Sequence, residues 1–228
     1  WDWNSLLTDD YSLLLRDYTK KYFPPADSFV QYMQDFQDKF QLNIRFNTEA
    51  MKIRKQDDEF LVELENGELL HTKHLLMASG VLKPYLPKDI PGIELTDSYC
   101  DVSVDKEKFI NKRVLVIGKG NSGFETADHL IETASLIHIV SRNPLKFAWR
   151  SHFPGHVRAV NNNFLDTYQL KSQNALINAN IANIEKRDDK LLVTFSYNLA
   201  SGEVETIEYD SVINCAGFEF DASIFDAS

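Results

Sequence analysis

Segment 113–127 constrains the fold more than any other part of the chain, because it joins an apolar run to a glycine-rich turn and an amphipathic stretch. Its sequence is RVLVIGKGNSGFETA. The β-branched and aliphatic residues before Gly118 predict a buried strand. A helix is predicted after the turn, because apolar residues recur at helical spacing, namely Phe124, Ala127, Leu130, Ile131 and Ala134. The apolar run Leu136–Val140 then predicts the next parallel strand of a βαβ unit.

The three glycines of this turn suit a dinucleotide. Gly118 permits a tight turn, Gly120 lets a pyrophosphate approach the backbone, and Gly123 lets helix and strand pack closely. The helix N-terminus adds N–H groups and partial positive charge. The spacing alone also occurs in ordinary glycine loops, but its place between a strand and a helix favours a nucleotide cofactor.

The end of the second strand indicates which dinucleotide is preferred. An Asp or Glu there binds the ribose 2′-hydroxyl of NAD, whereas this chain has Ser141 and Arg142. A hydroxyl and a guanidinium suit a dianionic phosphate, so the sequence favours NADPH. The alternative is that Arg142 only ends a surface strand, with Lys146 and Arg150 as other sources of charge.

Composition narrows the classes of partner. The 228 residues, 43% of them hydrophobic, can bury one large core or two modest ones, and two lobes fit best. The net charge of −10 argues against nucleic acid as a partner. Against that background a local basic cluster indicates an anion site, formed by Arg142, Lys146, Arg150 and Arg158. No apolar run approaches the roughly 18 residues of a transmembrane helix. The substrate, a small molecule or a protein, stays open, and a homodimer is compatible with the sequence.

The cysteines and histidines predict neither a redox dithiol nor a metal site. Cys100 and Cys215 are the only cysteines and lie outside any C-x-x-C motif. The histidine pairs 71/74 and 152/156 fall on a strand edge and on a loop broken by Pro and Gly, where surface or core roles are expected.

Short elements are predicted on both sides of a proline-rich connector, 83–92. Before it we expect a helix after Pro24–Pro25, capped by Asp27 or Ser28, with Phe29, Val30, Met33, Phe36 and Phe40 on one apolar face. Strands are predicted at 44–46, 50–54, 60–64, 69–71 and 75–80, with Asn66–Gly67 as a hairpin turn. A second lobe is expected from near Val104, with antiparallel strands at 180–186, 191–197 and 204–209 and an apolar strand from Ser211 that ends in small residues.

Several of these segments together resemble the flavin-containing monooxygenase superfamily. They are the strand end Ala78-Ser79-Gly80, the connector, the turn 118–123, Ser141-Arg142 and Cys215-Ala216-Gly217-Phe218. The likeness covers nearly the whole chain. Segments 3–7, 22–27 and 161–172 further resemble one branch of FAD-dependent oxidoreductases of the endoplasmic reticulum. That branch implies the ER lumen, while a cytoplasmic location is the alternative.

The resemblance implies an α/β, Rossmann-like flavoprotein with two dinucleotide-binding domains, the NADPH domain being inserted into the FAD domain. It assigns 1–103 to a partial FAD domain, 104–217 to the NADPH domain and 218–228 to a return into the FAD domain. The first FAD-binding fingerprint of the superfamily would precede Trp1. We therefore expect a fragment that lacks the first FAD βαβ unit.

The resemblance also implies roles for individual residues. Asn4 would lie beside the flavin as the catalytic residue, although an asparagine that caps a turn is the alternative. Ala50 would approach the adenine of FAD, and Ala78, Ser79 and Gly80 would border the flavin. NADPH would contact the pyrophosphate-binding set Gly118, Gly120, Asn121, Ser122 and Gly123, the 2′-phosphate pair Ser141 and Arg142, and Ala216 and Gly217 near the nicotinamide half.

The function implied is NADPH-dependent reduction of FAD, after which reduced flavin and oxygen oxidise a soft nucleophile. The superfamily fingerprint F-x-G-x-x-x-H is missing, because segment 95–100 has neither the glycine nor the histidine. One alternative is therefore a flavoprotein that reduces a partner protein or a quinone without inserting oxygen. Another is a non-enzymatic nucleotide-binding module in protein quality control.

Overall fold

The computed structural model divides the chain into two compact units, one formed by residues 1–75 with 224–228 and the other by Leu76–Ser223. The structure describes residues 11–21, 24–81, 83–168, 171, 173–200 and 202–225. Each unit is considered by itself. The larger unit contains the glycine-rich turn.

The helical part of the smaller unit consists of η1 (Leu15–Asp17) and α1 (Ala26–Phe40). The predicted helix is confirmed, but neither predicted cap is correct, because α1 starts one residue before Asp27 with Pro25 at the N-cap. The side chain of α1 that is fully buried is Tyr32, which meets Tyr18 edge-to-face with ring centroids 5.5 Å apart. The predicted apolar face is largely exposed, including Phe29, Val30, Met33 and Phe40.

A three-stranded antiparallel sheet follows, with β1 (Ala50–Gln56), β2 (Glu59–Leu64) and β3 (Leu69–Thr72). The predicted hairpin turn is confirmed. Gly67 has a φ of +82°, and the Asn66 side chain accepts a hydrogen bond from the Glu68 N–H at 2.9 Å. The strands predicted at 44–46 and 75–80 are wrong. A strand needs a neighbour to pair its backbone groups, and none of the described strands pairs with either segment.

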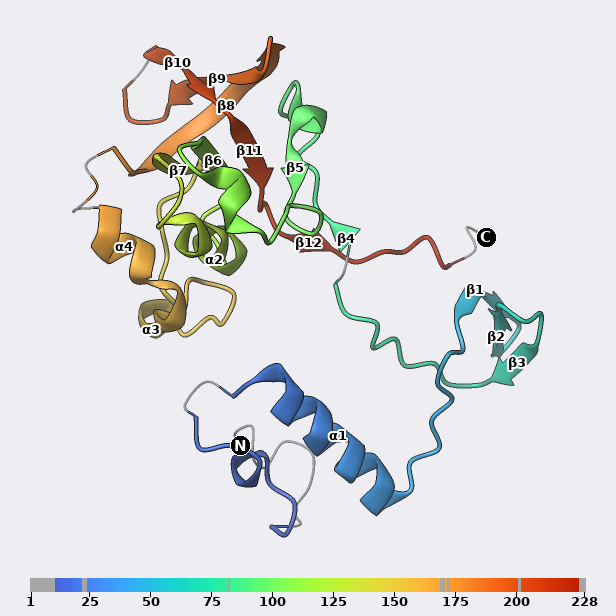
Figure 1. Ribbon diagram of the computed structural model, residues 1–228. Coiled ribbons are helices and arrows are strands. Elements are labelled where there is room, and N and C mark those ends of the chain that lie inside the picture. The colour runs from blue at the N-terminus through green and yellow to red at the C-terminus, as the bar shows by residue number, and fades with distance from the viewer. Residues whose placement is uncertain are drawn as a thin grey trace. The chain divides into compact units, whose positions relative to one another are not determined.

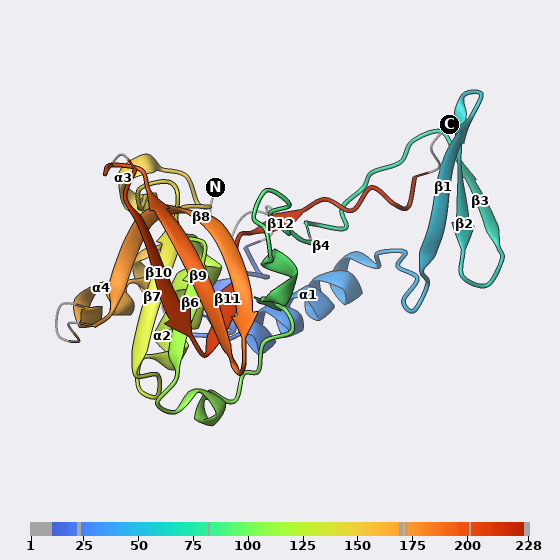
Figure 2. The same cartoon turned by 90° about the horizontal axis from the view of Figure 1, so that it is seen from above.

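The larger unit is built on a seven-stranded sheet with the order β10-β9-β8-β7-β6-β11-β5 (Figures 1 and 2). Its strands are β5 (Asp97–Ser98), β6 (Arg113–Ile117), β7 (Leu136–Ser141), β8 (Ala175–Arg187), β9 (Lys190–Tyr197), β10 (Val204–Tyr209) and β11 (Ser211–Asn214). Strands β5, β11, β6 and β7 and the first part of β8 run parallel, whereas β8, β9 and β10 pair antiparallel. The predicted βαβ unit and the predicted antiparallel strands that follow it are therefore both confirmed.

Short helices complete this unit. They are η2 (Ile93–Leu95), η3 (Lys106–Phe109), α2 (Asn121–Leu130), α3 (Ala148–Ser151), η4 (Ala159–Asn161) and α4 (Asn163–Tyr168). No helix in the described ranges is long and apolar enough to cross a bilayer.

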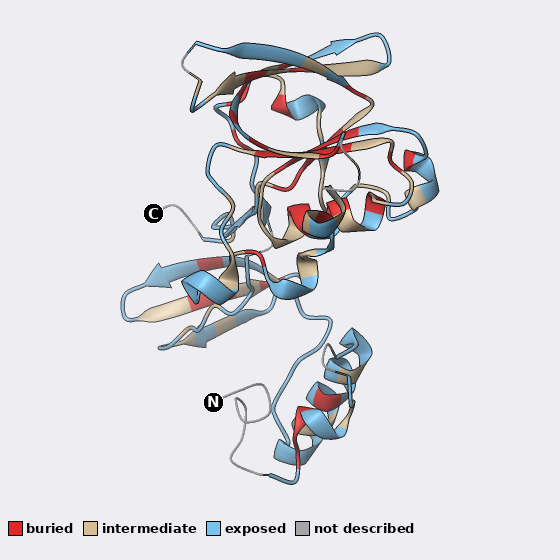
Figure 3. Ribbon diagram, turned by 90° about the vertical axis from the view of Figure 1, so that its left-hand side faces the viewer, coloured by how far each residue is buried: buried red, intermediate tan, exposed pale blue. Residues whose placement is uncertain are grey.

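Alternate residues of β6 pack into two separate hydrophobic cores, one on each face of the sheet. Val114 and Val116 pack in the cluster that holds Phe124 of α2, and Leu115 and Ile117 pack in the cluster that holds Phe195 of β9. Figure 3 shows buried positions along these strands and along α2. The centre of the sheet is thus covered on both sides, as a parallel sheet requires.

The larger unit begins at Leu76 instead of near Val104, because the proline-rich connector packs onto the sheet. Ile90 and Ile93 are buried in the core that contains Leu115, and the Ile184 N–H donates to the Pro91 carbonyl at 2.9 Å. The two units reflect how the chain packs and do not depend on which cofactor each part would bind. The assignment of 1–103, 104–217 and 218–228 to FAD and NADPH domains stays a prediction.

The connector also pairs with the chain that leaves β11. Strands β4 (Lys83–Pro84) and β12 (Phe218–Glu219) are antiparallel, and the Tyr85 N–H donates to the Gly217 carbonyl at 2.9 Å. The Asn214 side chain donates to the Tyr85 carbonyl at 3.0 Å. Two segments far apart in the sequence are therefore held side by side at the carboxyl end of β11.

We expect the free energy of unfolding to fall as the pH drops below about 6.5, because His138 is buried in β7. Its Nδ1 lies 2.6 Å from the Tyr209 hydroxyl and its Nε2 3.1 Å from the Gln173 carbonyl. Burial lowers the pKa of His138 in the folded chain, so the unfolded chain takes up the proton first. Denaturant titrations between pH 7.5 and 5.5 should show a loss of up to about 1.4 kcal/mol per pH unit.

His138→Gln should flatten that dependence over the same interval. His152→Asn is the matched control, since His152 is exposed and has a φ of +59°, which asparagine tolerates. If His138→Gln and the wild-type chain keep the same slope, His138 does not cause the pH dependence.

Candidate functional site

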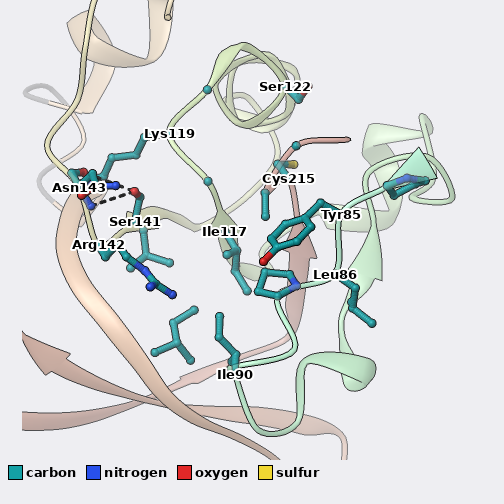
Figure 4. Close-up of a pocket in the computed structure, with 18 of the residues that line it drawn as sticks. Tyr85, Leu86, Ile90, Ile117, Lys119, Ser122, Ser141, Arg142, Asn143 and Cys215 are labelled. Atoms are coloured by element: carbon teal, nitrogen blue, oxygen red, sulfur yellow. Dashed lines mark hydrogen bonds between the residues drawn. The ribbon is translucent and has the colours of Figure 1, made fainter. Parts of the chain in front are cut away.

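A cleft of about 1360 Å³ opens at the carboxyl ends of β6, β7 and β11 (Figure 4). The chain passes from β6 through α2 to β7 on one side, while β11 and β5 lie on the other, so the cleft sits where the strand order reverses. Its walls come from the connector, the glycine-rich turn, the end of β7 and the segment after β11.

The turn after β6 brings three backbone segments into close contact. Gly118 has a φ of +115°, and a Cβ there would lie 2.3 Å from the Cys215 carbonyl oxygen. A Cβ at Gly123 would lie 2.1 Å from the Gly118 carbonyl oxygen. Any side chain at either position would push α2 or β11 away from the turn. The structure thus shows the tight turn and the close helix–strand packing that the sequence predicts.

Gly120 is different, because a Cβ there would meet no atom within 4 Å. It is the N-cap of α2, and the first hydrogen bond of the helix runs from the Phe124 N–H to the Gly120 carbonyl at 3.2 Å. The N–H groups of residues 121–123 precede that bond and have no intrahelical partner. Gly120, Asn121 and Ser122 line the cleft, so the N-terminus of α2 faces it.

The Asn121 side chain positions the loop that follows α3. Its Nδ2 donates to the His156 carbonyl at 2.9 Å, and its Oδ1 accepts from the Arg158 N–H at 2.9 Å and from the Asn161 amide at 3.0 Å. The amide group is therefore engaged within the protein. What Asn121 offers a ligand is its backbone N–H.

Ser141 is the last residue of β7 and Arg142 follows it, and both line the cleft. The Ser141 hydroxyl accepts from the Asn143 N–H at 3.2 Å, which closes a tight turn. Arg142 donates to the Asp89 carboxylate at 2.6 Å, and this hydrogen bond lowers the pKa of Asp89. Both side chains of the pair are more than half exposed, so water and other anions reach it.

Residues 215–217 form the wall on the β11 side. Ala216 and Gly217 line the cleft, and the Ala216 N–H donates to the Asn214 side chain at 3.1 Å. Burial raises the pKa of the Cys215 thiol to about 11, and its sulfur lies 3.6 Å from the Thr126 hydroxyl. A thiol of that kind stays protonated and is a poor nucleophile at neutral pH. Cys100 is also unpaired, so neither cysteine forms a disulfide.

The residues predicted to contact FAD do not lie in this cleft. Ala50 begins β1 in the smaller unit, and Ala78, Ser79 and Gly80 are exposed in a segment without regular structure. Asn4 lies outside the described residues. The structure therefore groups the predicted NADPH residues 118–122, 141–142 and 216–217, with Gly123 packed behind the turn.

Sequence reasoning missed five charged residues of the cleft, namely Lys83, Lys88, Asp89, Lys119 and Glu219. Lys119 stands inside the glycine motif, so its proximity to a nucleotide site was available from the sequence. The partner of Asp89 is Arg142 and that of Lys119 is Asn178, and both partners are more than fifty positions away and gave no local signal. In the described ranges no group of three His, Cys, Asp or Glu side chains has the arrangement of a metal site.

The sheet order and the cleft together define the fold as that of a dinucleotide-binding flavoprotein. Residues 8–228 match the model of the family described as pyridine nucleotide-disulphide oxidoreductase, and the chain belongs to that family. This confirms the resemblance to flavin-dependent oxidoreductases inferred from the motifs. The family generally uses FAD and NAD(P)H.

Curated relatives are similar along the whole chain. FAD-dependent oxidoreductase domain-containing protein 2 of Mus musculus is 36% identical over 100% of this chain, and its Danio rerio counterpart is 32% identical over 100%. The chain spans 38% and 40% of the lengths of these relatives.

Solved structures show the same fold at low identity. The bacillithiol disulfide reductase Bdr from Staphylococcus aureus superposes with a TM-score of 0.73 at 18% identity, over 98% of this chain and 64% of that chain. A flavin-containing monooxygenase from Stenotrophomonas maltophilia gives a TM-score of 0.71 at 16% identity, over 92% of this chain and 62% of that chain. One fold thus serves a reductase and a monooxygenase, and the fold alone does not choose between them.

Gly118→Ala should lower the free energy of unfolding by about 2 kcal/mol or more, because it combines a left-handed φ with a Cβ that overlaps the Cys215 carbonyl. Gly120→Ala is the matched control, since its Cβ meets open space, and it should cost no more than about 1 kcal/mol, because alanine only replaces glycine as the N-cap of α2. Equilibrium denaturation of both variants measures the difference. Equal stability of the two would contradict the close approach at Gly118.

Proposed function

We propose that the cleft binds NADPH and that the whole protein passes a hydride from NADPH to FAD, in chemistry of the flavin monooxygenase type. NADPH when bound supplies the hydride, and FAD accepts it. The chain's own contribution is to bind and orient the nucleotide. The chain spans 38% and 40% of the lengths of these curated relatives. The activity that we propose for the whole protein therefore rests on this nucleotide site.

The residues present fit a dinucleotide. The backbone at Gly120 leaves room for a pyrophosphate, and the helix N-terminus beside it offers N–H groups. Ile117, Val140 and Ile181 give an apolar floor on which an adenine or nicotinamide ring can pack.

The observation that carries the proposal is the charge of the cleft. The chain has a net charge of −10, yet five lysines and arginines line this one cleft, namely Lys83, Lys88, Lys119, Arg142 and Lys146. Lys83 pairs with Glu219 at 3.2 Å and Arg142 with Asp89 at 2.6 Å. Within the described part of the chain no ion pair is recorded for the other three. Such a cleft attracts a polyanion such as a nucleotide with three phosphates.

Whether oxygen is inserted is a separate question, on which the sequence gives one observation. Segment 95–100, which contains β5, lacks the glycine and the histidine of the superfamily fingerprint. Their absence favours, as the second candidate, a flavoprotein that reduces a partner protein or a quinone. The thiols do not favour a dithiol route, because Cys215 is buried and its pKa is raised. Comparing oxygen uptake with substrate oxidation in the whole protein separates the candidates.

Arg142→Ala should raise the dissociation constant of NADPH about tenfold or more and leave that of NADH nearly unchanged, because only NADPH carries the 2′-phosphate. Loss of one charge-assisted contact corresponds to roughly 1.4 kcal/mol or more. Fluorescence titration of the purified chain measures both constants.

Two further variants sharpen the test. Arg150→Ala removes a nearby arginine that does not line the cleft and should change neither constant. Asp89→Asn releases Arg142 from its carboxylate and should tighten NADPH binding. Equal losses for NADPH and NADH in Arg142→Ala would rule out the assigned 2′-phosphate contact.

A further inference from the structure

Lys119 reaches across the end of β7 to β8. It is the second residue of the glycine-rich turn after β6, and its Nζ donates to the Asn178 side-chain oxygen. Asn178 lies on β8 opposite Ser141 of β7 in the parallel register. The lysine therefore crosses the strand that separates β6 from β8. Figure 4 shows it on the same side of the cleft as Ser141, Arg142 and Asn143.

The positive charge of Lys119 has no negative partner in the described part of the chain. Its recorded hydrogen-bond acceptor, Asn178, is a neutral amide. The side chain is partly buried, and burial lowers its pKa to about 8. A partly buried cation without a carboxylate costs free energy unless a ligand supplies the negative charge.

Arg142 stands in contrast, since it is already paired with Asp89. The pair of Arg142 and Asp89 is neutral as a whole, and the carboxylate repels any phosphate that approaches the guanidinium. A dianionic phosphate at the end of β7 therefore needs a further cation from the protein. Lys119 is the cation that the fold directs to this strand end.

We propose that Lys119 determines specificity for a 2′-phosphorylated nucleotide, binding the 2′-phosphate together with Arg142. This inference rests on the proposed nucleotide site and names a residue through which the site distinguishes NADPH from NADH. It implies that the Nζ exchanges its amide partner for the phosphate, or contacts both through its three N–H donors.

The proposal has a pH signature. A lysine that must be protonated to bind phosphate loses its contribution as the pH rises through about 8. The phosphate itself is already a dianion above about pH 7, since its second pKa is about 6. Affinity for a 2′-phosphorylated nucleotide should therefore fall between pH 7.5 and 9.5.

The experiment compares 2′,5′-ADP (adenosine 2′,5′-bisphosphate) with 5′-AMP, two probes that differ only in the 2′-phosphate, by isothermal titration calorimetry on the purified chain. Lys119→Met should weaken 2′,5′-ADP about tenfold and 5′-AMP less than twofold. Lys119→Arg should keep the affinity for 2′,5′-ADP and lose the pH dependence, because arginine stays charged. Arg150→Met, which removes a cation that does not line the cleft, should change neither affinity more than twofold and controls for the general field.

The outcomes separate this inference from the proposed function. If the wild-type chain binds neither probe, both the nucleotide site and the role of Lys119 are overturned. If both probes bind and Lys119→Met weakens them equally or not at all, the nucleotide site stands and the role of Lys119 is overturned. If Lys119→Met does not fold, as judged by circular dichroism, the pH profile of Lys119→Arg decides, and a wild-type slope in that variant overturns the proposal.

Discussion

The close approach of Gly118 to the Cys215 carbonyl is the constraint on which the rest of the larger unit depends. Because no side chain intervenes, β6 and β11 stay in register to their last residues, and α2 starts at Asn121, four positions after β6 ends. Gly123, in the first turn of α2, makes a second close approach, because a Cβ there would lie 2.1 Å from the Gly118 carbonyl oxygen. The hydrogen bonds from the Gly118 N–H to the Val140 carbonyl and from the Cys215 N–H to the Ile117 carbonyl, both 2.8 Å, hold this arrangement. Backbone contact between three segments thus aims the N-terminus of α2 into the cleft.

Electrostatics then selects what the cleft can hold. Three lysines that form no ion pair among the described residues, Lys88, Lys119 and Lys146, line one cleft of an acidic chain and create a local attraction for anions against its overall field. The ion pair between Asp89 and Arg142 moderates that attraction and keeps the guanidinium oriented at the strand end. Lys119 adds charge from a different element, the turn after β6, and reaches the same strand end. Under the proposed function, cofactor preference would depend on three side chains, Asp89 of the connector, Lys119 of the turn and Arg142 directly after β7.

Much of the fold near the glycine motif could be predicted from the sequence, because periodicity and turn chemistry act locally. The strand before Gly118, helix α2, strand β7 and the Asn66–Gly67 turn all follow from patterns within about ten residues. The prediction of strands at 44–46 and 75–80 was wrong, since short apolar runs form strands only where a neighbour pairs with them. The sequence pattern also did not predict that the proline-rich connector contributes side chains to a hydrophobic core. Its Ile90 and Ile93 are part of a core whose other members lie on distant strands.

The site residues also fall into two groups, those predicted from local sequence and those that depend on distant parts of the chain. The residues of the turn and of the β7 end were found from the motif, and the structure places them around one cleft. The partners that set their charge, Asp89 for Arg142 and Asn178 for Lys119, are non-local and follow only from the sheet order.

The most direct test of the central claim is a backbone amide NMR titration of the chain with NADP⁺. We expect saturable chemical-shift changes in the amides of residues 119–123 and of Arg142, where the helix N-terminus and the strand end would meet the nucleotide. Saturable shifts confined to other parts of the chain, or none at millimolar nucleotide, would contradict it.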